Sequence, residues 1–353
     1  MSAITANRPG KVSLNFVAVS RDVRDLLTTL SATSPPLLTH AHRIEGPCSH
    51  PPSCRVYNPP AVGCRPLNLA SLLRSATRAR APVFRPITTD MGVKIVPRPS
   101  QERGHADHDW LKTFHTFSFA SYYDPSHAQF GALRVINEDR VEPRRGFGTH
   151  PHREFEIFSY LVSGQLEHKD SMGNTEILKR GDVQLTSAGT GIAHSEKTHG
   201  ATPVHFLQIW SVPSVSRLAP RYFTRHFSDE EKRDAWVRIV APVDAEGVVT
   251  EREGAGPAPV QSQLTLYATL LSPGTTLKQR MVGKKGYIHV VQTSGYSTSE
   301  GKGAAVRVVG APGVQAQLRE GDGAYMHFDT HGLKLTVDNI GESTAEVLLF
   351  DLE

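Results

Sequence analysis

Residues 146–156 read GFGTHPHREFE and residues 187–196 read SAGTGIAHSE, and these two Gly-rich stretches organise the rest of the chain. Side chains two residues apart in a β-strand project to the same face. His150 and His152 therefore project together, and so do His194 and Glu196. On two facing strands, three imidazoles and one carboxylate would converge on one point. This donor set predicts a site for a divalent transition metal.

The spacing of these residues makes the signal stronger than a lone His-x-His pair. Such pairs arise by chance in a chain with 17 histidines, and most histidines serve hydrogen bonds. Here the pair lies beside glycines, which let backbones approach closely, and an in-phase His-x-Glu pair follows in a second Gly-rich segment. We expect a metal site, with a structural cluster of hydrogen bonds as the alternative.

Length and composition bound the architecture. A chain of 353 residues has room for two compact domains. Its apolar runs are short, and none approaches the roughly 20 residues that a membrane-spanning helix needs, so we expect a soluble protein without a membrane partner. Residues 91–353 carry 28 Lys and Arg against 31 Asp and Glu, which argues against a broad nucleic-acid surface.

Residues 1–90 differ from the rest of the chain. They carry 11 Lys and Arg against 4 acidic residues and contain all three cysteines, Cys48, Cys54 and Cys64, whose spacing fits no zinc pattern. Residues 68–89 hold four arginines and no acid, which is typical of mitochondrial transit peptides. We expect residues 1–90 to be a disordered, targeting or spurious extension. The absence of cysteine after residue 90 fits a reducing compartment, so the expected location is cytoplasmic or nuclear, or mitochondrial if the extension is a transit peptide.

From Met91 onward, short apolar segments separated by turn signals recur about every 8–12 residues, which indicates a β-barrel or sandwich. The fold class predicted is all-β with a few short helices. Ser228 and Glu231 have capping-box spacing and predict a helix start, whereas 168–175 resembles a hairpin turn. The expected strands span residues 93–97, 110–119, 131–138, 155–162, 183–186, 205–212, 264–271, 286–292, 306–309, 323–327, 334–337 and 345–352.

Several of these segments resemble the pirin family of the cupin superfamily, and most of all its bacterial branch of quercetin 2,3-dioxygenases. The matching segments are HTFSFASYYDP (115–125), GALRVINEDRV (131–141), GFGTHPHREFEI (146–157), LEHKDSMGN (166–174), SAGTGIAHSE (187–196) and VLLFDL (347–352). The resemblance implies two stacked cupin-type β-barrels, a bicupin, of which only the N-terminal one holds metal. It implies His150, His152, His194 and Glu196 as the ligands. We expect a metal-binding barrel over 91–228, a connecting segment over 229–259 and a metal-free barrel over 260–353.

Two residues compete for the position of the fourth ligand. Glu156 also lies in phase with both histidines of the first stretch, where the general cupin pattern places a Glu. The pirin-type His-x-Glu favours Glu196. Glu156 would then support the ligands or pair with Arg153 or Arg134.

Other candidates carry weaker signals. His115 is expected to be a buried, hydrogen-bonded residue, or otherwise to line the pocket. Solvent or core positions are expected for His199 and His205, and no metal is expected at His327 and His331. Further guesses are an apolar pocket from Phe147, Phe155, Met172 and Trp210, and support of the ligands by Thr149 and Ser195.

The resemblance implies two functions. The first is a metal-dependent dioxygenase that opens the ring of a flavonol such as quercetin with O₂ and releases carbon monoxide. Fe(II) is the expected ion, with copper, nickel, zinc or manganese as alternatives, and Glu196 is the expected general base. The second is a non-enzymatic, redox-sensing cofactor of transcription factors. The same ligands serve both functions, so they do not discriminate between them.

Overall fold

The structure is a computed structural model that describes residues 92–353. The predictions for residues 1–90, including the three cysteines and the transit peptide, lie outside the described residues. Strands dominate the described part, and its one α-helix, α1, spans only Asp229–Lys232. Two 3₁₀ turns, η1 (Ser100–Glu102) and η2 (Pro125–His127), complete its helical segments. The prediction of an all-β chain with short helices is confirmed.

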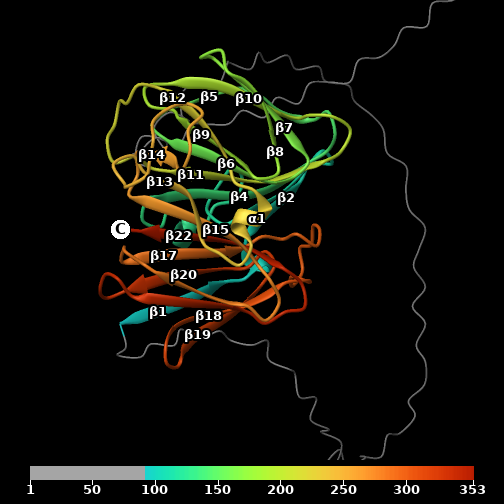
Figure 1. Ribbon diagram of the computed structural model, residues 1–353. Helices are drawn as coiled ribbons and strands as arrows, with labels where there is room; N and C mark the ends of the chain where they lie inside the picture. Colours follow the sequence, from blue (N-terminus) through green and yellow to red (C-terminus); the bar gives the residue numbers. More distant parts are fainter. Residues whose placement is uncertain (1–91) are drawn as a thin grey trace, which may run out of the picture. The chain divides into compact units, whose positions relative to one another are not determined.

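Two sheets form the first barrel, drawn from teal through green to yellow in Figure 1. The four-stranded sheet has the order β5 (Gly146–His152), β10 (Ile192–Thr198), β7 (Gln165–Asp170) and β8 (Thr175–Lys179). The seven-stranded sheet has the order β12 (Arg221–His226), β9 (Asp182–Ser187), β6 (Glu156–Ser163), β11 (Val204–Ser211), β4 (Leu133–Val141), β3 (Leu111–His115) and β2 (Gly104–Asp107).

Two further sheets form the second barrel, drawn mainly in orange and red. The seven-stranded sheet has the order β1 (Val93–Arg98), β20 (Gly323–Phe328), β17 (Lys285–Val290), β22 (Ala345–Leu352), β15 (Leu264–Leu271), β13 (Val237–Pro242) and β14 (Ala258–Val260). The four-stranded sheet has the order β16 (Thr276–Arg280), β21 (Lys334–Asn339), β18 (Ala305–Ala311) and β19 (Val314–Arg319).

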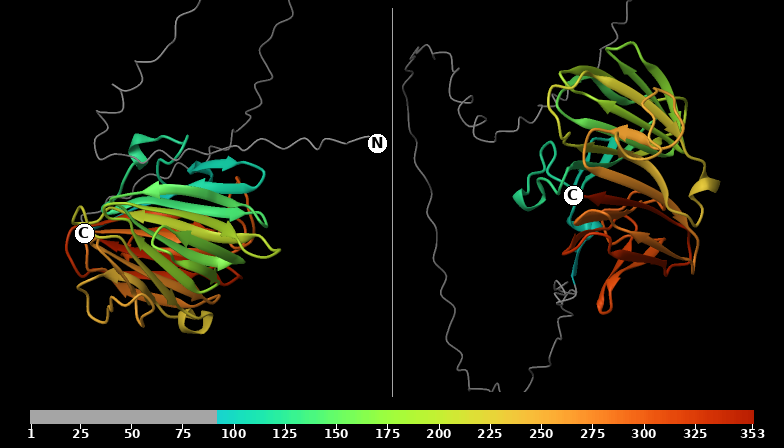
Figure 2. Two further views of the ribbon diagram at one scale, coloured as in Figure 1. Left: turned by 90° about the horizontal axis from the view of Figure 1, so that it is seen from above. Right: turned by 60° about the vertical axis from the view of Figure 1, so that its left-hand side comes forward.

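The two seven-stranded sheets lie between the two four-stranded ones, and the two barrels are stacked, as Figures 1 and 2 agree. One apolar cluster joins the seven-stranded sheets and includes Phe158 and Tyr160 of β6 with Tyr287 and Phe350 of the second barrel. Full burial of each such side chain contributes about 1.5–3 kcal/mol. The period of two in β6 places Ser159 on its opposite face, inside the first barrel.

A buried carboxylate also links the barrels. Glu138 of β4 accepts hydrogen bonds from Arg103 (3.2 Å), His205 (3.1 Å), His289 of β17 (3.2 Å) and the backbone N–H of Gln292 (2.8 Å). Burial raises the pKa of Glu138, but the hydrogen bonds from the two histidines and the charge of Arg103 outweigh it and hold this pKa well below its usual range. The ionised carboxylate therefore holds groups from both barrels together.

Strand β1 does not pair with the half of the chain that follows it in sequence. It pairs antiparallel with β20, so that Val93 lies opposite Phe328, and Figure 1 shows β1 in cyan among the orange and red strands. Strand β13 and the first two residues of β14, which fall within the expected connecting segment, belong to strands of the same sheet. The division at residues 228 and 259 stays a prediction, and the pairing of β1 adds a connection that the sequence pattern does not indicate.

The interiors of the two barrels differ. The second is filled by one apolar cluster, which includes Val306, Leu335 and Val347. The first contains two smaller apolar clusters, one around Leu166 and Phe206 and the other around Val135, Ile157 and Trp210. Buried polar side chains also lie inside the first barrel, and these form the candidate site.

Most expected strands occur, and the differences have local causes. Strands β15 and β22 have the expected bounds. The segment 110–119 stops pairing after His115, because the chain turns back with a bridge between Phe119 and Tyr122 and a positive φ of 50° at Ala120. The helix predicted from Ser228 has its capping box but ends after one turn, because Arg233 is extended.

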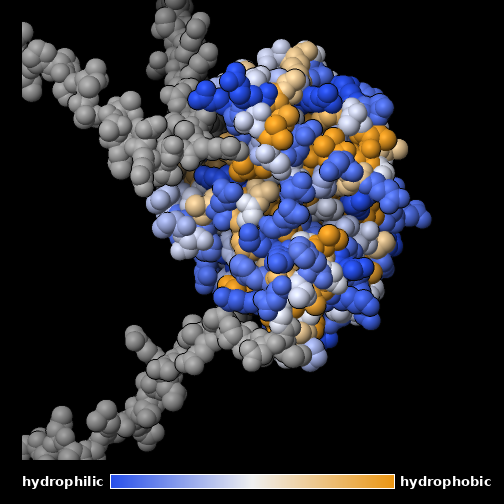
Figure 3. Space-filling model, turned by 90° about the vertical axis from the view of Figure 1, so that its left-hand side faces the viewer, coloured by the Kyte–Doolittle hydropathy of each residue, from blue (hydrophilic) through white to orange (hydrophobic). Residues whose placement is uncertain are grey.

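The described part of the chain contains no helix long and apolar enough to span a membrane. One face of the surface mixes hydrophilic and hydrophobic residues (Figure 3). Exposed large apolar side chains include Tyr123, Val215 and Val282. Singly scattered apolar residues of this kind are normal on protein surfaces.

Candidate metal centre

Three histidines converge at the paired strands β5 and β10. His150 lies directly opposite His194 in the antiparallel register, and His152 lies opposite Ile192. The ring centroids of His150, His152 and His194 are 4.7 Å apart in every pair. We call these three residues the outer set. Their nitrogens lie within 4.8 Å of one another, a spacing that a single transition-metal ion can bridge.

Glu196 points into the same barrel but belongs to a second group. The register of β10 on β5 shifts between His194 and Glu196, so Glu196 lies opposite Phe147 on β5. On its other side, in the unshifted register of β10 on β7, Glu196 lies opposite His168. Ligand atoms of His168, His194 and Glu196 lie within 4.8 Å of one another, and we call these the inner set. The four predicted ligands are thus distributed over two groups that share His194.

The surroundings of the outer set suit metal binding. Nδ1 of His150 donates to the carbonyl oxygen of Gly148 at 2.7 Å, so Nε2 of His150 is the unprotonated nitrogen, and it lies 3.2 Å from Nε2 of His194. In the described part of the chain, nothing hydrogen-bonds Nε2 of His152 or Nδ1 of His194, although both atoms are buried. Burial lowers the pKa of His152 to about 3 and that of His194 well below its usual range. Neutral imidazoles are the form that binds metals.

The carboxylate of Glu196 is held by two amides. Gln184 of β9 donates to Oε1, and Gln208 of β11 donates to Oε2 at 2.8 Å. Ser159 donates to Oε1 at 3.4 Å. Burial raises the pKa of Glu196 to about 7, although these hydrogen bonds oppose the rise. The carboxyl is therefore poised to exchange a proton near neutral pH.

Sequence reasoning missed the residues that orient this carboxyl. The hydroxyl of Tyr222 donates to Oε1 of Gln184 at 2.9 Å, and the Tyr222 ring stacks on His168 at 4.7 Å. His168 was expected in a hairpin turn, yet it lies within β7, and the turn begins at Ser171. The sequence signal that could have identified Gln184 and Gln208 was a lone glutamine in each of two apolar strands, VQL at 183–185 and LQI at 207–209.

An aromatic wall closes one side of the outer set. The ring of Trp210 lies 4.8 Å from that of His152, and Phe155 packs against Trp210 at 5.3 Å. The other two expected pocket residues lie elsewhere: Phe147 packs against Trp110, and Met172 is exposed. Only two of the four expected pocket residues, Phe155 and Trp210, therefore lie beside the histidines.

Glu156 is fully buried but belongs to neither set. It accepts a hydrogen bond from the hydroxyl of Ser187 at 2.6 Å and another from the backbone N–H of Gln261 at 3.2 Å. Among the described residues it forms no ion pair with Arg153 or Arg134, so that expectation is wrong. Glu156 instead ties β6 to β9 and to the segment before β15.

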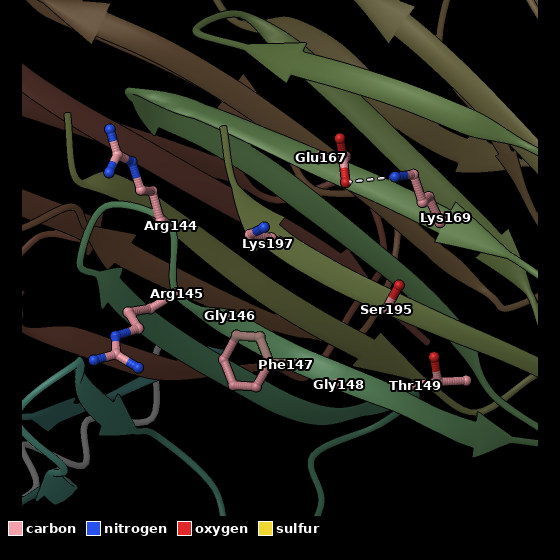
Figure 4. Close-up of a pocket in the computed structure, with 10 residues that line it drawn as sticks. All are labelled: Arg144, Arg145, Gly146, Phe147, Gly148, Thr149, Glu167, Lys169, Ser195 and Lys197. Atoms are coloured by element: carbon pink, nitrogen blue, oxygen red, sulfur yellow. Dashed lines mark ion pairs between the residues drawn. The ribbon is translucent and has the colours of Figure 1, made fainter. Parts of the chain in front are cut away.

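Thr149 and Ser195 do not support the ligands. Strand alternation turns them outward, where they line a hollow of about 440 Å³ on the outer face of the four-stranded sheet. Figure 4 shows Arg144, Arg145 and Lys197 around this hollow. The guess that Thr149 and Ser195 orient the histidines is wrong, because the sheet backbone separates them from the barrel interior.

The remaining histidines lie outside both sets. His115 is buried, and its Nδ1 lies 2.8 Å from Oδ1 of Asn137, as predicted. His205 is buried against Glu138, and His199 is partly exposed near Glu167. In the second barrel, Nδ1 of His331 donates to the carbonyl of Val282.

Comparisons with known proteins agree with this architecture. A family model described as Pirin matches residues 97–211. The quercetin 2,3-dioxygenase of Escherichia coli strain K12 is 38% identical over 260 residues, which cover 73% of this chain and 98% of that protein. The crystal structure of the bacterial pirin YhhW from Escherichia coli in complex with nickel(II) has 36% identity and a TM-score of 0.59, and covers 73% of this chain and 98% of that one.

Proposed function

We propose that this chain, which belongs to the pirin family, binds a divalent transition metal through His150, His152, His194 and Glu196 and oxygenates a flavonol-like substrate. The chain is an oxidoreductase by its relationship to the quercetin 2,3-dioxygenases. The observation that carries the proposal is the convergence of three imidazoles, with ring centroids 4.7 Å apart, beside a buried carboxyl. Of the three, His152 and His194 are buried and His150 is partly buried.

The donor set favours a borderline metal ion. Imidazole suits iron, copper, nickel and zinc, and a single carboxylate is compatible with all of them. We propose Fe(II), with copper, nickel, zinc and manganese as alternatives, and YhhW provides a relative that holds nickel(II). The bound ion would act as a Lewis acid that lowers the pKa of a substrate hydroxyl.

Glu196 is placed to receive the proton of that hydroxyl. Its carboxyl has a ligand atom within 4.8 Å of one on His194. Gln184 and Gln208 each donate to a different oxygen, so the carboxyl is fixed in position. A cation bound beside it would favour the ionised form of this carboxyl, which is the form that accepts a proton as general base.

The aromatic wall is suited to a flat substrate. Trp210 and Phe155 lie next to His152, and Ile157 and Val135 pack with them. Apolar side chains here would stack against an aromatic ring and exclude water from the reacting hydroxyl. The flavonol is therefore the substrate class that we propose, with O₂ as the second substrate.

Oxygen uptake with quercetin tests the proposal. Full-length protein loaded with Fe(II) or Ni(II) should consume oxygen, and His152→Ala should abolish the uptake. His331→Ala, an exposed histidine of the second barrel, is the matched control and should retain it. Equal rates for His152→Ala and His331→Ala would rule out turnover at this centre. The role as a transcription-factor cofactor and the cellular location stay predictions.

A further inference from the structure

The hollow on the outer face of the four-stranded sheet has no part in the proposed oxygenation. It lies where the register of β10 on β5 shifts, so that Gly148 and Thr149 of β5 lie against Ser195 of β10 alone. This arrangement is a β-bulge, whose extra residue is left out of the hydrogen-bonded ladder. Gly148 is exposed, and a Cβ added to it would meet no atom within 4 Å. The bulge therefore leaves open space beside bare backbone.

Three positively charged side chains border this hollow without a negative partner. Arg144 and Arg145 lie in the turn before β5, and Lys197 lies on β10 (Figure 4). All three are exposed, and none forms an ion pair with another residue of the described part of the chain. Arg144 has a φ of 62°, a backbone conformation that is uncommon for residues other than Gly. Such conformations cluster at sites that bind ligands.

The hollow has a strong excess of positive charge. Among the described residues that line it, Glu167 is the one acid, and its Oε1 lies 2.8 Å from Nζ of Lys169. The hydrogen bond from Lys169 lowers the pKa of Glu167, and the charges of Lys169 and Lys197 add to this effect. Four basic side chains and one carboxylate leave the hollow with a charge of +3, whereas residues 91–353 have more acidic than basic residues. A positive patch on an acidic body attracts anions.

The lining favours a phosphate ester with hydroxyl groups over a flat aromatic ligand. Guanidinium groups match the geometry of phosphate oxygens, and an ammonium group adds a compact charge. Thr149 and Ser195 contribute hydroxyls, which can donate to ligand oxygens or accept from them. Phe147 is the aromatic residue of the lining, but its ring packs against Trp110. The volume of about 440 Å³ lies in the range of small-molecule sites and exceeds what one inorganic phosphate fills.

We propose that this hollow binds a phosphorylated, hydroxyl-rich small molecule of the sugar phosphate class. Arg144, Arg145 and Lys197 hold the phosphate group, and Thr149 and Ser195 bind ligand hydroxyls. A phosphate monoester carries a charge of about −1.5 to −2 at neutral pH, which complements the excess positive charge. The sheet backbone separates the hollow from the barrel interior, so the inference does not depend on the proposed oxygenase activity.

Equilibrium dialysis of full-length protein tests the site with glucose 6-phosphate, inorganic phosphate and glucose as probes. We expect glucose 6-phosphate to bind, inorganic phosphate to bind more weakly, and glucose not to bind. Because salt screens exposed charges, the Kd for glucose 6-phosphate should rise with sodium chloride concentration. The proposal is overturned if glucose 6-phosphate does not bind at millimolar concentration, or if glucose binds equally well.

Two double variants with the same change in charge locate the binding. Arg144→Gln/Arg145→Gln should raise the Kd for glucose 6-phosphate by about 10-fold or more, because it removes two charged donors. Lys278→Gln/Lys284→Gln removes two exposed cations of the second barrel that form no ion pair among the described residues, and it should leave the Kd unchanged. Equal Kd values for the two double variants would place the binding elsewhere and overturn the proposal.

A single variant covers failure of the arginine double variant to fold, as judged by circular dichroism. Lys197→Gln changes one exposed side chain of β10 and should also raise the Kd. In the wild type, the backbone amide NMR signals of Thr149 and Ser195 should shift when glucose 6-phosphate is added. Shifts confined to other parts of the chain overturn the proposal. So does binding of single-stranded RNA, and not of glucose 6-phosphate, through Arg144 and Arg145, which would assign the hollow to nucleic acid.

Discussion

His150 and His194 face each other across the antiparallel strands β5 and β10, with their Nε2 atoms 3.2 Å apart. The carbonyl of Gly148 accepts the Nδ1 hydrogen of His150, so Nε2 of His150 is unprotonated. This nitrogen either accepts a hydrogen from His194 or shares a cation with it. Backbone pairing alone brings the two rings together, because directly opposed residues in an antiparallel pair have neighbouring side chains.

His194 belongs to both sets, so its removal should affect metal binding more than any other substitution. We expect His194→Ala to raise the Kd for Ni(II) by more than about 100-fold, the upper end of the loss caused by a supporting group. His150→Ala should have a smaller effect, because His152, His194 and Glu196 remain as donors. Calorimetric titration measures both, with His199→Ala as the control. Equal Kd values for His194→Ala and His199→Ala would contradict the assignment of His194.

Gln208 stabilises the charged form of Glu196 through its hydrogen bond to Oε2. Gln208→Leu should therefore raise the pKa of Glu196 further above its usual value. The pKa is measurable in metal-free protein by NMR titration of ¹³C-labelled glutamate side chains. Gln129→Leu, whose amide donates to the Gly131 carbonyl at an exposed position, is the control. An unshifted titration in Gln208→Leu would show that the bond contributes nothing to the charged form.

His115 should make the protein sensitive to mild acid. Burial lowers its pKa from 6.5 to about 4, so between these values the unfolded chain binds more protons than the native one. Stability must then fall as the pH falls from 6.5 to 4, by at most about 3 kcal/mol from this residue. Chemical unfolding across this range should show a shallower decline for His115→Gln than for wild type. Parallel curves would exclude His115 as a source of the acid sensitivity.

Glu138 should be essential for the contact between the barrels. Glu138→Ala leaves Arg103 buried beside two histidines without its anion, and loss of one partner of a buried pair costs about 3–5 kcal/mol. Because the folded pKa of Glu138 is depressed, its contribution is present above its unfolded pKa and is lost as the pH falls towards the folded one.

The unfolding midpoint in urea measures the cost of Glu138→Ala. The surface pair of Lys112 and Asp107 provides the control. Asp107→Ala should shift the midpoint far less, because water already screens that pair. Comparable shifts for the two variants would mean that the inter-barrel cluster contributes little.

The sequence predicted the β-rich fold through its alternation and turn signals, and β15 and β22 have the predicted bounds. Strands such as β2 and β14 escaped prediction because they are short. Strand β19 alternates apolar and polar residues and was missed despite that signal. The sequence pattern also did not predict that β1 belongs to the second barrel. Pairing with β20 depends on where two segments more than 200 residues apart meet, and local pattern carries no information about that.

The sequence by itself determined that His150, His152, His194 and Glu196 project inward, because period-two geometry is a property of each strand. Only the tertiary structure decided how those side chains are grouped. The register of β10 on β5 shifts between His194 and Glu196, whereas the unbroken register of β10 on β7 places Glu196 opposite His168, at the other edge of β10. The amides of Gln184 and Gln208 reach Glu196 from the opposite sheet. Contacts across a closed barrel depend on register and closure, which spacing along one strand cannot specify.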